Sequence, residues 1–380
     1  MESPTIIDSY EALESLAAML AGLSEIAVDT ESNSFHNYHE RICLLQISTP
    51  DLDYIIDPLA IPDLLPLKEV FARPLPQKIF HAAENDVVLL KRHFGFEILN
   101  VFDTLLAAQI LGHREVGLAA LLSNLFSIQL DKGEQRSDWS RRPLSHTQII
   151  YAACDTRHLI RLRDTLQREL QKEARTSAAE EEFQRLAEKE PVERQPDPAA
   201  YLRIKGARKL SPESRGILQK LFAWREDTAR SLDRPPFRIL SNEALLELTR
   251  RRPISWEGVG RIRGVTAKTI SRFGNDILDA IRQGREEGEK PPPKSNHGNR
   301  NRREEWTDEM EARYRRLKEW RNRRAEGLSV EPFIVASNRI LVNLARLAPN
   351  SIETLTKIPG MSQWRVTDYG KEMLETLQRS

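Results

Sequence analysis

The chain contains 380 residues, 40% of them hydrophobic, with 57 Lys and Arg against 56 Asp and Glu. Since a domain averages roughly 150 residues, this length predicts two or three domains, each large enough to bury a core. No segment approaches the ~18 consecutive apolar residues of a membrane span. The two cysteines, Cys43 and Cys154, lack metal-binding or redox spacing. We therefore expect a soluble, cytoplasmic protein with no membrane partner.

The charge is balanced overall but unevenly distributed. Residues 1–200 contain 20 Lys and Arg against 32 Asp and Glu, whereas residues 201–380 contain 37 against 24. An acidic half beside a basic half is typical of a metal-dependent catalytic domain joined to a region that captures a polyanion. Nucleic acid is the polyanion that we expect.

Strand-like and helix-like patterns alternate along the first 165 residues. The amphipathic spacing of residues 10–20 predicts a helix. Apolar runs over 26–31, 42–48 and 54–57 predict three strands joined as an antiparallel meander. Together with the elements that follow, this order predicts a mixed α/β sheet with helices on its faces.

A fourth strand is predicted over residues 78–82, and Asn85 is a candidate N-cap for the helix that runs to Phe94. A short strand at 100–102 then precedes Asp103 and another helix. The simpler role for Asp103 is to cap that helix, and the alternative is direct metal binding.

Two pairs of side chains can each reach a common site. Asp29 and Glu31 end a strand and project from one face, while Thr30 projects from the other. Tyr151 and Asp155 are four residues apart in a helical segment, so they project from one face about one turn apart.

Asp86 lies between these pairs in the sequence, at a strand-to-helix junction. Each acid alone has a structural explanation: a strand-end turn residue, a first-turn acid or an exposed helix side chain. Four converging carboxylates repel strongly and are tolerated only if they are protonated or if a hard cation neutralises them. The joint pattern favours a site for Mg²⁺ or Mn²⁺.

Residues 135–140 form a loop with a second possible function. Trp139 beside Arg136 and Lys132 has the composition to stack a base while the cations bind phosphate. The alternative is that Trp139 anchors the loop.

These motifs resemble the ribonuclease D branch of the DEDD 3′-to-5′ exonucleases, in the form with a tyrosine in its third motif. Asp29 and Glu31 match the first motif, residues 81–86 match the second, and Tyr151 and Asp155 match the third. The segments 130–132 and 137–139 also resemble this branch. The resemblance implies a ribonuclease H-like fold for the first domain.

One position departs from the family pattern. Ser32 occupies a site where many relatives have an aromatic residue, and Phe35 is the expected substitute in contacting a terminal base.

The resemblance also implies a mechanism that uses two divalent cations, Mg²⁺ or Mn²⁺, to hydrolyse a phosphodiester. Asp29 would bridge the two ions, Glu31 and Asp155 would complete the ion on the side of the nucleophile, and Asp86 would support the other. Tyr151 would orient the attacking water, because a phenol with a pKa near 10 is a poor general base at neutral pH.

The second half of the chain repeats itself with a shift of 96 residues. Trp224 and Arg225 fall on Trp320 and Arg321, and the matches continue to Gly370. The two modules resemble the HRDC domain, a small helical bundle, and a tandem pair is the ribonuclease D arrangement. Exposed arginines of these modules, Arg321 among them, are the candidates for RNA backbone contacts.

The expected architecture is therefore a mixed-sheet, ribonuclease H-like exonuclease domain followed by two all-α HRDC bundles. The expected boundaries are an exonuclease domain at 1–170, a charged connector at 171–200, HRDC modules at 201–288 and 305–380, and a proline- and arginine-rich linker at 289–304.

We expect a monomeric 3′-to-5′ exoribonuclease that releases nucleoside 5′-monophosphates from tRNA precursors and other structured or single-stranded RNA 3′ ends. The alternatives are a DNA-directed exonuclease of the same fold and an RNA-binding scaffold without activity. Retention of Asp29, Glu31, Asp86, Tyr151 and Asp155 disfavours the scaffold, whereas only the tandem HRDC arrangement favours RNA over DNA.

Overall fold

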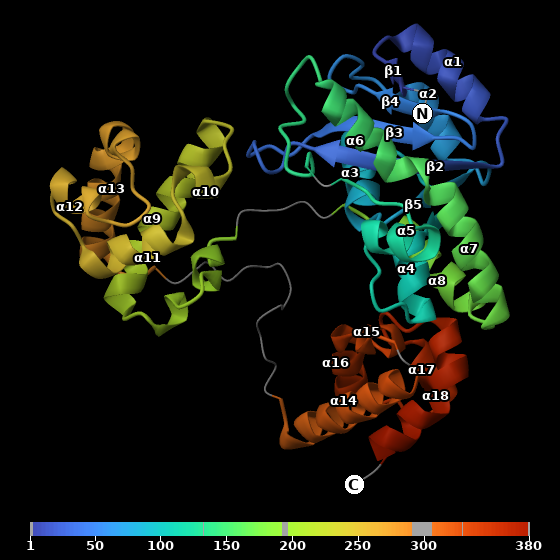
Figure 1. Cartoon of the computed structure of the whole chain (residues 1–380). Coiled ribbons are helices and arrows are strands. Elements are labelled where there is room, and N and C mark those ends of the chain that lie inside the picture. Colours follow the sequence, from blue (N-terminus) through green and yellow to red (C-terminus); the bar gives the residue numbers. More distant parts are fainter. Residues whose placement is uncertain (1–2, 132, 192–196, 291–305, 329, 379–380) are drawn as a thin grey trace. The chain divides into compact units, whose positions relative to one another are not determined.

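The computed structural model describes residues 3–131, 133–191, 197–290, 306–328 and 330–378. These residues form two compact units, and Figure 1 shows their elements. Unit 1 contains Met1–Glu31, Ile42–Pro191 and Arg300–Ser380, and unit 2 contains Ser32–Arg41 and Val192–Asn299. Within the described ranges, no helix is long and apolar enough to cross a membrane.

A six-stranded sheet with the order β1-β4-β3-β2-β5-β6 forms the centre of unit 1. Its pairings β1–β4, β2–β5 and β5–β6 are parallel and β3–β4 is antiparallel, so the predicted mixed sheet is confirmed. Every residue of β3 is buried, because the strand is central and is packed against α3 and α6. The strands are β1 (Thr5–Ile7), β2 (Glu25–Ser32), β3 (Ile42–Ser48), β4 (Asp53–Ile56), β5 (Gln77–Phe80) and β6 (Val101–Asp103).

The meander expected over residues 26–57 did not include β1. This strand has only three residues, too few to produce a periodic signal, and its pairing with β4 in parallel extends the sheet beyond the meander.

Helices pack against the sheet through regularly spaced apolar residues. In α7, Leu159, Leu162, Leu166 and Leu170 recur every three or four residues and all are buried. The helices of this domain are α1 (Tyr10–Leu20), α2 (Leu65–Phe71), α3 (Glu84–Phe94), α4 (Thr104–Leu111), α5 (Leu118–Phe126), α6 (His146–Arg157), α7 (Leu159–Lys172) and α8 (Thr176–Ala187).

The start of α3 differs from the expectation. Asn85 was predicted to be the N-cap, but α3 begins at Glu84 and Ala83 occupies the N-cap position without a side-chain cap. The turn that enters the helix is made at Ala82, where φ is +64°. Asp86 nevertheless lies in the first turn, as predicted.

Residues 171–200 are not only a connector, because they contain α8. Ala178, Ala179 and Phe183 are buried on one face of this helix, and the Phe183 ring packs 4.6 Å from that of Phe102 in β6. Because the segment is rich in glutamate, the sequence analysis did not predict this amphipathic helix, which packs on the edge strand β6. The linker expected at 289–304 lies mostly outside the described residues, which resume at 306.

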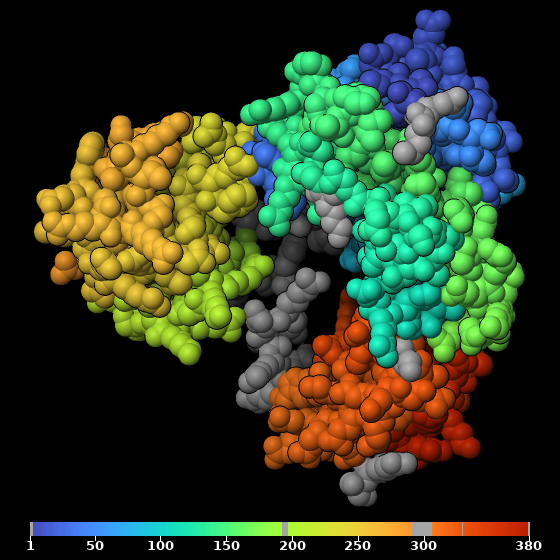
Figure 2. Space-filling view, viewed as in Figure 1, coloured from blue at the N-terminus to red at the C-terminus, as the bar shows by residue number. Residues whose placement is uncertain are grey.

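The second helical module belongs to unit 1, where it packs against α8. Arg365 Nη1 donates to Glu182 at 2.6 Å, and Trp364 N donates to Glu181 at 3.0 Å. Figure 2 shows this module in orange and red beside teal and green parts of the same unit. Its helices are α14 (Asp308–Leu328), α15 (Pro332–Val335), α16 (Asn338–Leu347), α17 (Ile352–Thr356) and α18 (Gln363–Gln378).

The first helical module forms most of unit 2. Its long helices α9 and α13 approach closely at Gly216 and Gly284. A Cβ added to Gly284 would lie 2.4 Å from the Ile217 backbone of α9, and one added to Gly216 would lie 2.7 Å from the Gly284 carbonyl oxygen of α13. The elements are η1 (Ala200–Arg203), η2 (Ala207–Lys209), α9 (Pro212–Ser231), α10 (Pro236–Ile239), α11 (Asn242–Arg251), α12 (Trp256–Gly260) and α13 (Ala267–Glu287). Residues 32–41 join this unit because Asp233 accepts hydrogen bonds from the backbone N–H groups of Tyr38 and His39.

The sequence repeat corresponds to a repeated structure, since α9 to α13 match α14 to α18 in order. One repeated arginine has a structural role in both modules. Arg225 is 5% exposed and donates to Leu240 O, and Arg321 is 6% exposed and donates to Ala336 O. Arg321 is therefore not the exposed cation that its charged surroundings predicted.

Candidate active site

The carboxyl end of β2 supplies two acids of the site. The preceding residues Ile26, Ala27 and Val28 are fully buried and hold the strand in the middle of the sheet, between β3 and β5. The alternation of a strand then places Asp29 and Glu31 on one face.

Helix α6 supplies the other residues of the site. A capping box begins this helix, with the Ser145 side chain bonded to the Gln148 backbone and the Gln148 side chain bonded to the Ser145 backbone. Ala152 and Ala153 are buried against the sheet, and α6 contacts β3 and β4. Tyr151 and Asp155 therefore project together toward the end of β2, as their spacing predicted.

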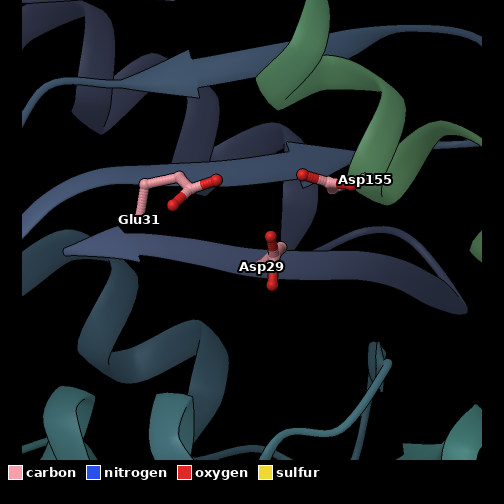
Figure 3. Close-up of side chains that lie close together, drawn as sticks. All are labelled: Asp29, Glu31 and Asp155. Carbon is pink, nitrogen blue, oxygen red and sulfur yellow. The ribbon is translucent and has the colours of Figure 1, made fainter. Parts of the chain in front are cut away.

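Three carboxylates converge where β2 and α6 meet. Ligand atoms of Asp29, Glu31 and Asp155 all lie within 4.8 Å of one another. Figure 3 shows the three side chains facing a common space, two from the strand and one from the helix. Among the described residues, this is the one group of His, Cys, Asp and Glu close enough to hold a metal ion.

Burial and mutual repulsion disfavour ionisation of this cluster. Burial and the charges of Asp86, Asp155 and Glu31 raise the pKa of Asp29 well above its usual range. Burial, followed by the charges of Asp155 and Asp86, raises the pKa of Glu31 to about 9. Burial raises the pKa of Asp155 to about 7, although a hydrogen bond from the Tyr151 hydroxyl opposes the shift.

A cation would relieve this repulsion. The carboxylates cannot all be ionised at neutral pH without a neutralising charge, and a set of carboxylate oxygens is the donor set that hard divalent cations prefer. The residues present therefore fit a divalent metal ion.

Asp86 lies beside this group, not within it. The residue is 8% exposed, and its carboxylate accepts a hydrogen bond from Thr30 Oγ1 at 2.5 Å. Burial raises the pKa of Asp86 to about 6, and the Thr30 hydrogen bond opposes that shift. Its charge acts in turn on the pKa of Asp29. Thr30, which strand alternation assigned to the opposite face, is thus a site residue that the sequence analysis missed.

Tyr151 remains a phenol at neutral pH. Burial and the charges of Asp155, Glu31 and Asp29 hold its pKa above its usual range. The hydroxyl can therefore donate a hydrogen bond but cannot accept a proton from water, which supports orientation over general base catalysis.

Trp139 anchors the loop before α6. It is 1% exposed, and its ring lies 5.9 Å from that of Tyr151 with an interplanar angle of 35°. Of the two roles considered for Trp139, the structure supports the structural one, because the buried ring is not available to a base. Arg136 and Phe35 are exposed, Phe35 by 54%, whereas Lys132 lies outside the described residues.

Arg142 secures the same loop and was not identified from the sequence. Its guanidinium donates to both carboxylate oxygens of Asp57, at 2.5 and 2.7 Å, and to the carbonyl oxygens of Trp139 and Cys43. The Arg142 guanidinium holds the pKa of Asp57 below its usual range, although burial acts in the opposite direction. This ion pair ties the loop that carries Trp139 to β3 and to the residue after β4.

Comparison with known proteins identifies the domains. A 3′–5′ exonuclease family model matches residues 4–171, and an HRDC domain model matches residues 214–281 and 310–377. The catalytic core of RRP6 from Trypanosoma brucei is 29% identical, with a TM-score of 0.68 over 75% of this chain and 82% of that one. Escherichia coli RNase D, described as an exoribonuclease involved in structured RNA processing, has the same fold, with a TM-score of 0.68 and 24% identity over 99% of both chains.

The sequence relatives extend over both halves of the chain. A ribonuclease D of Granulibacter bethesdensis is 32% identical over 378 residues, which cover 98% of this chain and 92% of the relative. The match therefore spans the acidic cluster, the exonuclease domain and both HRDC modules of this chain. The chain belongs to the ribonuclease D family of 3′–5′ exoribonucleases.

Proposed function

We propose that this protein shortens RNA from its 3′ end by metal-dependent hydrolysis and releases nucleoside 5′-monophosphates. The convergence of Asp29, Glu31 and Asp155 within 4.8 Å carries the proposal. Two divalent cations, Mg²⁺ or Mn²⁺, supply the activation of water and the stabilisation of the leaving 3′ oxygen in nucleases of this chemistry.

The roles of the side chains follow from their positions. Asp29, Glu31 and Asp155 would hold a cation where β2 meets α6, and Asp86 would hold a second one on the side of α3. The Tyr151 hydroxyl, which donates to Asp155, would orient the attacking water beside that carboxylate.

Nucleic acid is the substrate class that the charge distribution supports. A basic patch on unit 2 contains Lys205, Arg208, Lys209 and Arg250, all exposed. Arg250, in α11, lies beside the segment that carries the other three cations. Its Nη2 atom is 3.8 Å from where a Cβ would lie on Gly206, the residue between Lys205 and the start of η2. None of the four forms an ion pair within the described part of the chain, whereas the neighbouring Arg251 pairs with Glu247. Unpaired cations are the ones free to bind phosphate.

The proposed substrates are tRNA precursors and other structured RNAs with single-stranded 3′ ends. Family membership supports this choice, and so does the description of the Escherichia coli structural relative as an enzyme of structured RNA processing.

The test compares three substrates of one sequence: a 5′-labelled linear RNA, the same RNA circularised, and single-stranded DNA. With Mg²⁺ or Mn²⁺ we expect the linear RNA to give a ladder that shortens from the 3′ end, with release of 5′-monophosphates and no product in EDTA. Cleavage of the circle would show an endonuclease, and equal rates on DNA would favour a DNA-directed exonuclease. Binding without any cleavage would indicate the scaffold.

A further inference from the structure

A single buried carboxylate joins the starts of two helices. Asp103, the last residue of β6, is 1% exposed and caps α4 by accepting from Leu105 N at 2.8 Å and Leu106 N at 3.0 Å. The same side chain accepts from Ala83 N at 2.8 Å and from Ala82 N at 3.3 Å, in the turn before α3. The cap of α4 requires only Oδ1 of Asp103, whereas the bond from Ala83 N is accepted by Oδ2.

In the turn before α3, the His81 ring hydrogen-bonds Thr104 at 2.9 Å, but Ala82 and Ala83 have no polar side chain to hold their own backbone. Ala82 has a φ of +64°, a conformation that residues other than glycine seldom adopt, and alanine offers no polar side chain to stabilise it. Ala83 occupies the N-cap position of α3 and likewise cannot cap the helix. Asp103 reaches the turn because β6 pairs in parallel with β5, and Phe80, which ends β5, is its direct partner.

This turn determines where Asp86 lies. Strand β5 runs parallel beside β2, so the turn that follows β5 places the first turn of α3 next to the end of β2. Asp86 there accepts the Thr30 hydroxyl at 2.5 Å. A change in the Ala82 backbone would rotate the start of α3 and move Asp86 away from Thr30 and from Asp29 and Glu31, the acids on either side of Thr30 in β2.

We propose that Asp103 is a positioning residue for the metal site. Its carboxylate holds the Ala82–Ala83 turn in its left-handed conformation and thereby fixes Asp86 for metal binding. The inference rests on the proposed role of Asp86 as a metal ligand. Loss of a side chain that orients a metal ligand typically weakens metal binding or activity by about 10- to 100-fold.

The test separates the two functions of Asp103 with Asp103→Ser and Asp103→Asn in the full-length protein. Serine remains a good N-cap for α4 but is too short to reach the turn before α3. Asparagine keeps one acceptor oxygen and presents an amide NH₂ where the other oxygen was. Mn²⁺ binding is measured by electron paramagnetic resonance without RNA, and kcat and KM are measured at several Mn²⁺ concentrations.

We expect both variants to bind Mn²⁺ about 10- to 100-fold more weakly and to lose kcat at low Mn²⁺, with KM for RNA unchanged. Excess Mn²⁺ should restore part of the rate. Adding Ala82→Gly to Asp103→Ser should also recover Mn²⁺ affinity, because glycine adopts a positive φ without strain. A residue that only caps α4 would not respond to a change at Ala82.

Ser9→Ala is the matched control, since it removes the N-cap of α1, a helix whose main partner is α2. It should lower the melting temperature without changing Mn²⁺ binding. Normal Mn²⁺ affinity in Asp103→Ser, or no recovery on adding Ala82→Gly, would overturn the inference. Asp86→Asn distinguishes the two levels: if it too binds Mn²⁺ normally, the proposed role of Asp86 as a metal ligand fails, whereas weaker binding there with normal binding in the Asp103 variants rejects only the positioning role.

Discussion

At the scale of single residues, the main feature of the site is that buried acids lie close together, which makes their ionisation unfavourable. Burial raises the pKa values of Asp29, Glu31, Asp86 and Asp155, and the charges of neighbouring acids raise those of Asp29, Glu31 and Asp86 further. The same shifts make each acid a candidate metal ligand, since perturbed carboxyl groups cluster at functional sites. Substitutions that retain shape but remove charge are therefore informative.

Asp155→Asn and Asp29→Asn each remove a charged oxygen ligand while keeping the size of the side chain. We expect turnover to fall by several orders of magnitude in Mg²⁺, with the melting temperature and RNA binding close to those of the wild type. Single-turnover cleavage and filter binding measure the two effects. Asp164→Asn, on the exposed face of α7, is the control and should be fully active; a fully active Asp155→Asn protein would contradict the site.

Tyr151→Phe removes the hydroxyl that donates to Asp155. We expect a large loss of kcat with Mn²⁺ binding close to normal, because the phenol orients water and does not hold the metal. Since burial and neighbouring acids keep the pKa of Tyr151 above its usual range, the wild type and the variant should show the same tyrosinate absorbance at 295 nm up to pH 10. Extra tyrosinate in the wild type near pH 8 would instead support general base catalysis.

The metal-free protein should lose stability as the pH rises from about 4, the ordinary pKa of a carboxyl group, toward 9. The folded-state pKa values of Asp86, Asp155 and Glu31 are raised to about 6, about 7 and about 9, so the folded state binds protons more tightly than the unfolded chain over this interval. The stability that these protons contribute is therefore fully present at a pH below the carboxyl pKa values of the unfolded chain. It is lost as the pH rises through the pKa values of the three acids in the folded protein.

Thermal unfolding in EDTA across this range measures the effect. Mg²⁺ should remove most of the pH dependence by replacing the protons, and Glu31→Gln should flatten the curve near pH 9. An identical slope in Glu31→Gln and in the wild type would show that other groups cause it.

At the scale of elements, the position of α6 depends on the loop before it. Trp139 packs on Tyr151, and Arg142 ties that loop to Asp57 and to the carbonyl oxygens of Cys43 and Trp139. The pair is only partly buried, with 28% of the Arg142 side chain and 10% of the Asp57 side chain exposed. Removing Arg142 would leave the Asp57 carboxylate, the more buried partner, without its ion pair, and that is destabilising.

Arg142→Met should therefore lower kcat and expose the loop while the rest of the fold persists. Limited proteolysis between residues 127 and 145, together with the fluorescence of Trp139, reports the loosened loop. Arg141→Met is a matched control, since that neighbouring side chain is 82% exposed and pairs with the nearby Asp138. Equal activity and equal protease resistance in both variants would remove Arg142 from the support of the site.

At the scale of the whole molecule, the two HRDC modules have different surroundings. The second packs on α8 through Arg365 and Trp364, and one apolar cluster includes residues of the exonuclease domain and of this module, such as Phe183 and Val335. A chain ended at Glu190 would expose that surface, so truncation is a poor test of RNA capture. Substitutions on unit 2 avoid this difficulty.

Lys205→Ala, Arg208→Ala and Lys209→Ala together should weaken binding of a folded tRNA precursor. Each lost phosphate contact should reduce the magnitude of the slope of log K against log salt by about 0.7 to 0.9. The measurement uses Asp29→Asn backgrounds at several salt concentrations. The control removes the same amount of charge from three arginines that pair with acids on or beside their own helices: Arg251→Ala, Arg261→Ala and Arg282→Ala. Equal effects of the two sets of substitutions would show that the basic patch has no special role.

The sequence by itself determined those features that depend on local geometry. Strand alternation put Asp29 and Glu31 on one face, helical spacing put Tyr151 beside Asp155, and the repeat defined two similar helical modules. The predicted mixed sheet, helical modules and exoribonuclease family are all confirmed. Each follows from the period of an element or from motif identity, which needs no knowledge of distant contacts.

Only the tertiary structure decided which groups meet across elements. The Thr30 hydrogen bond to Asp86, the double role of Asp103 and the burial of Trp139 each join residues far apart in the chain. The sequence analysis did not predict α8, because its segment is rich in glutamate. Its apolar face is buried only through packing against β6 and α18, which are distant in the sequence. Periodicity specifies the face that a side chain occupies, whereas the partner on that face depends on strand order and helix packing, which no local pattern contains.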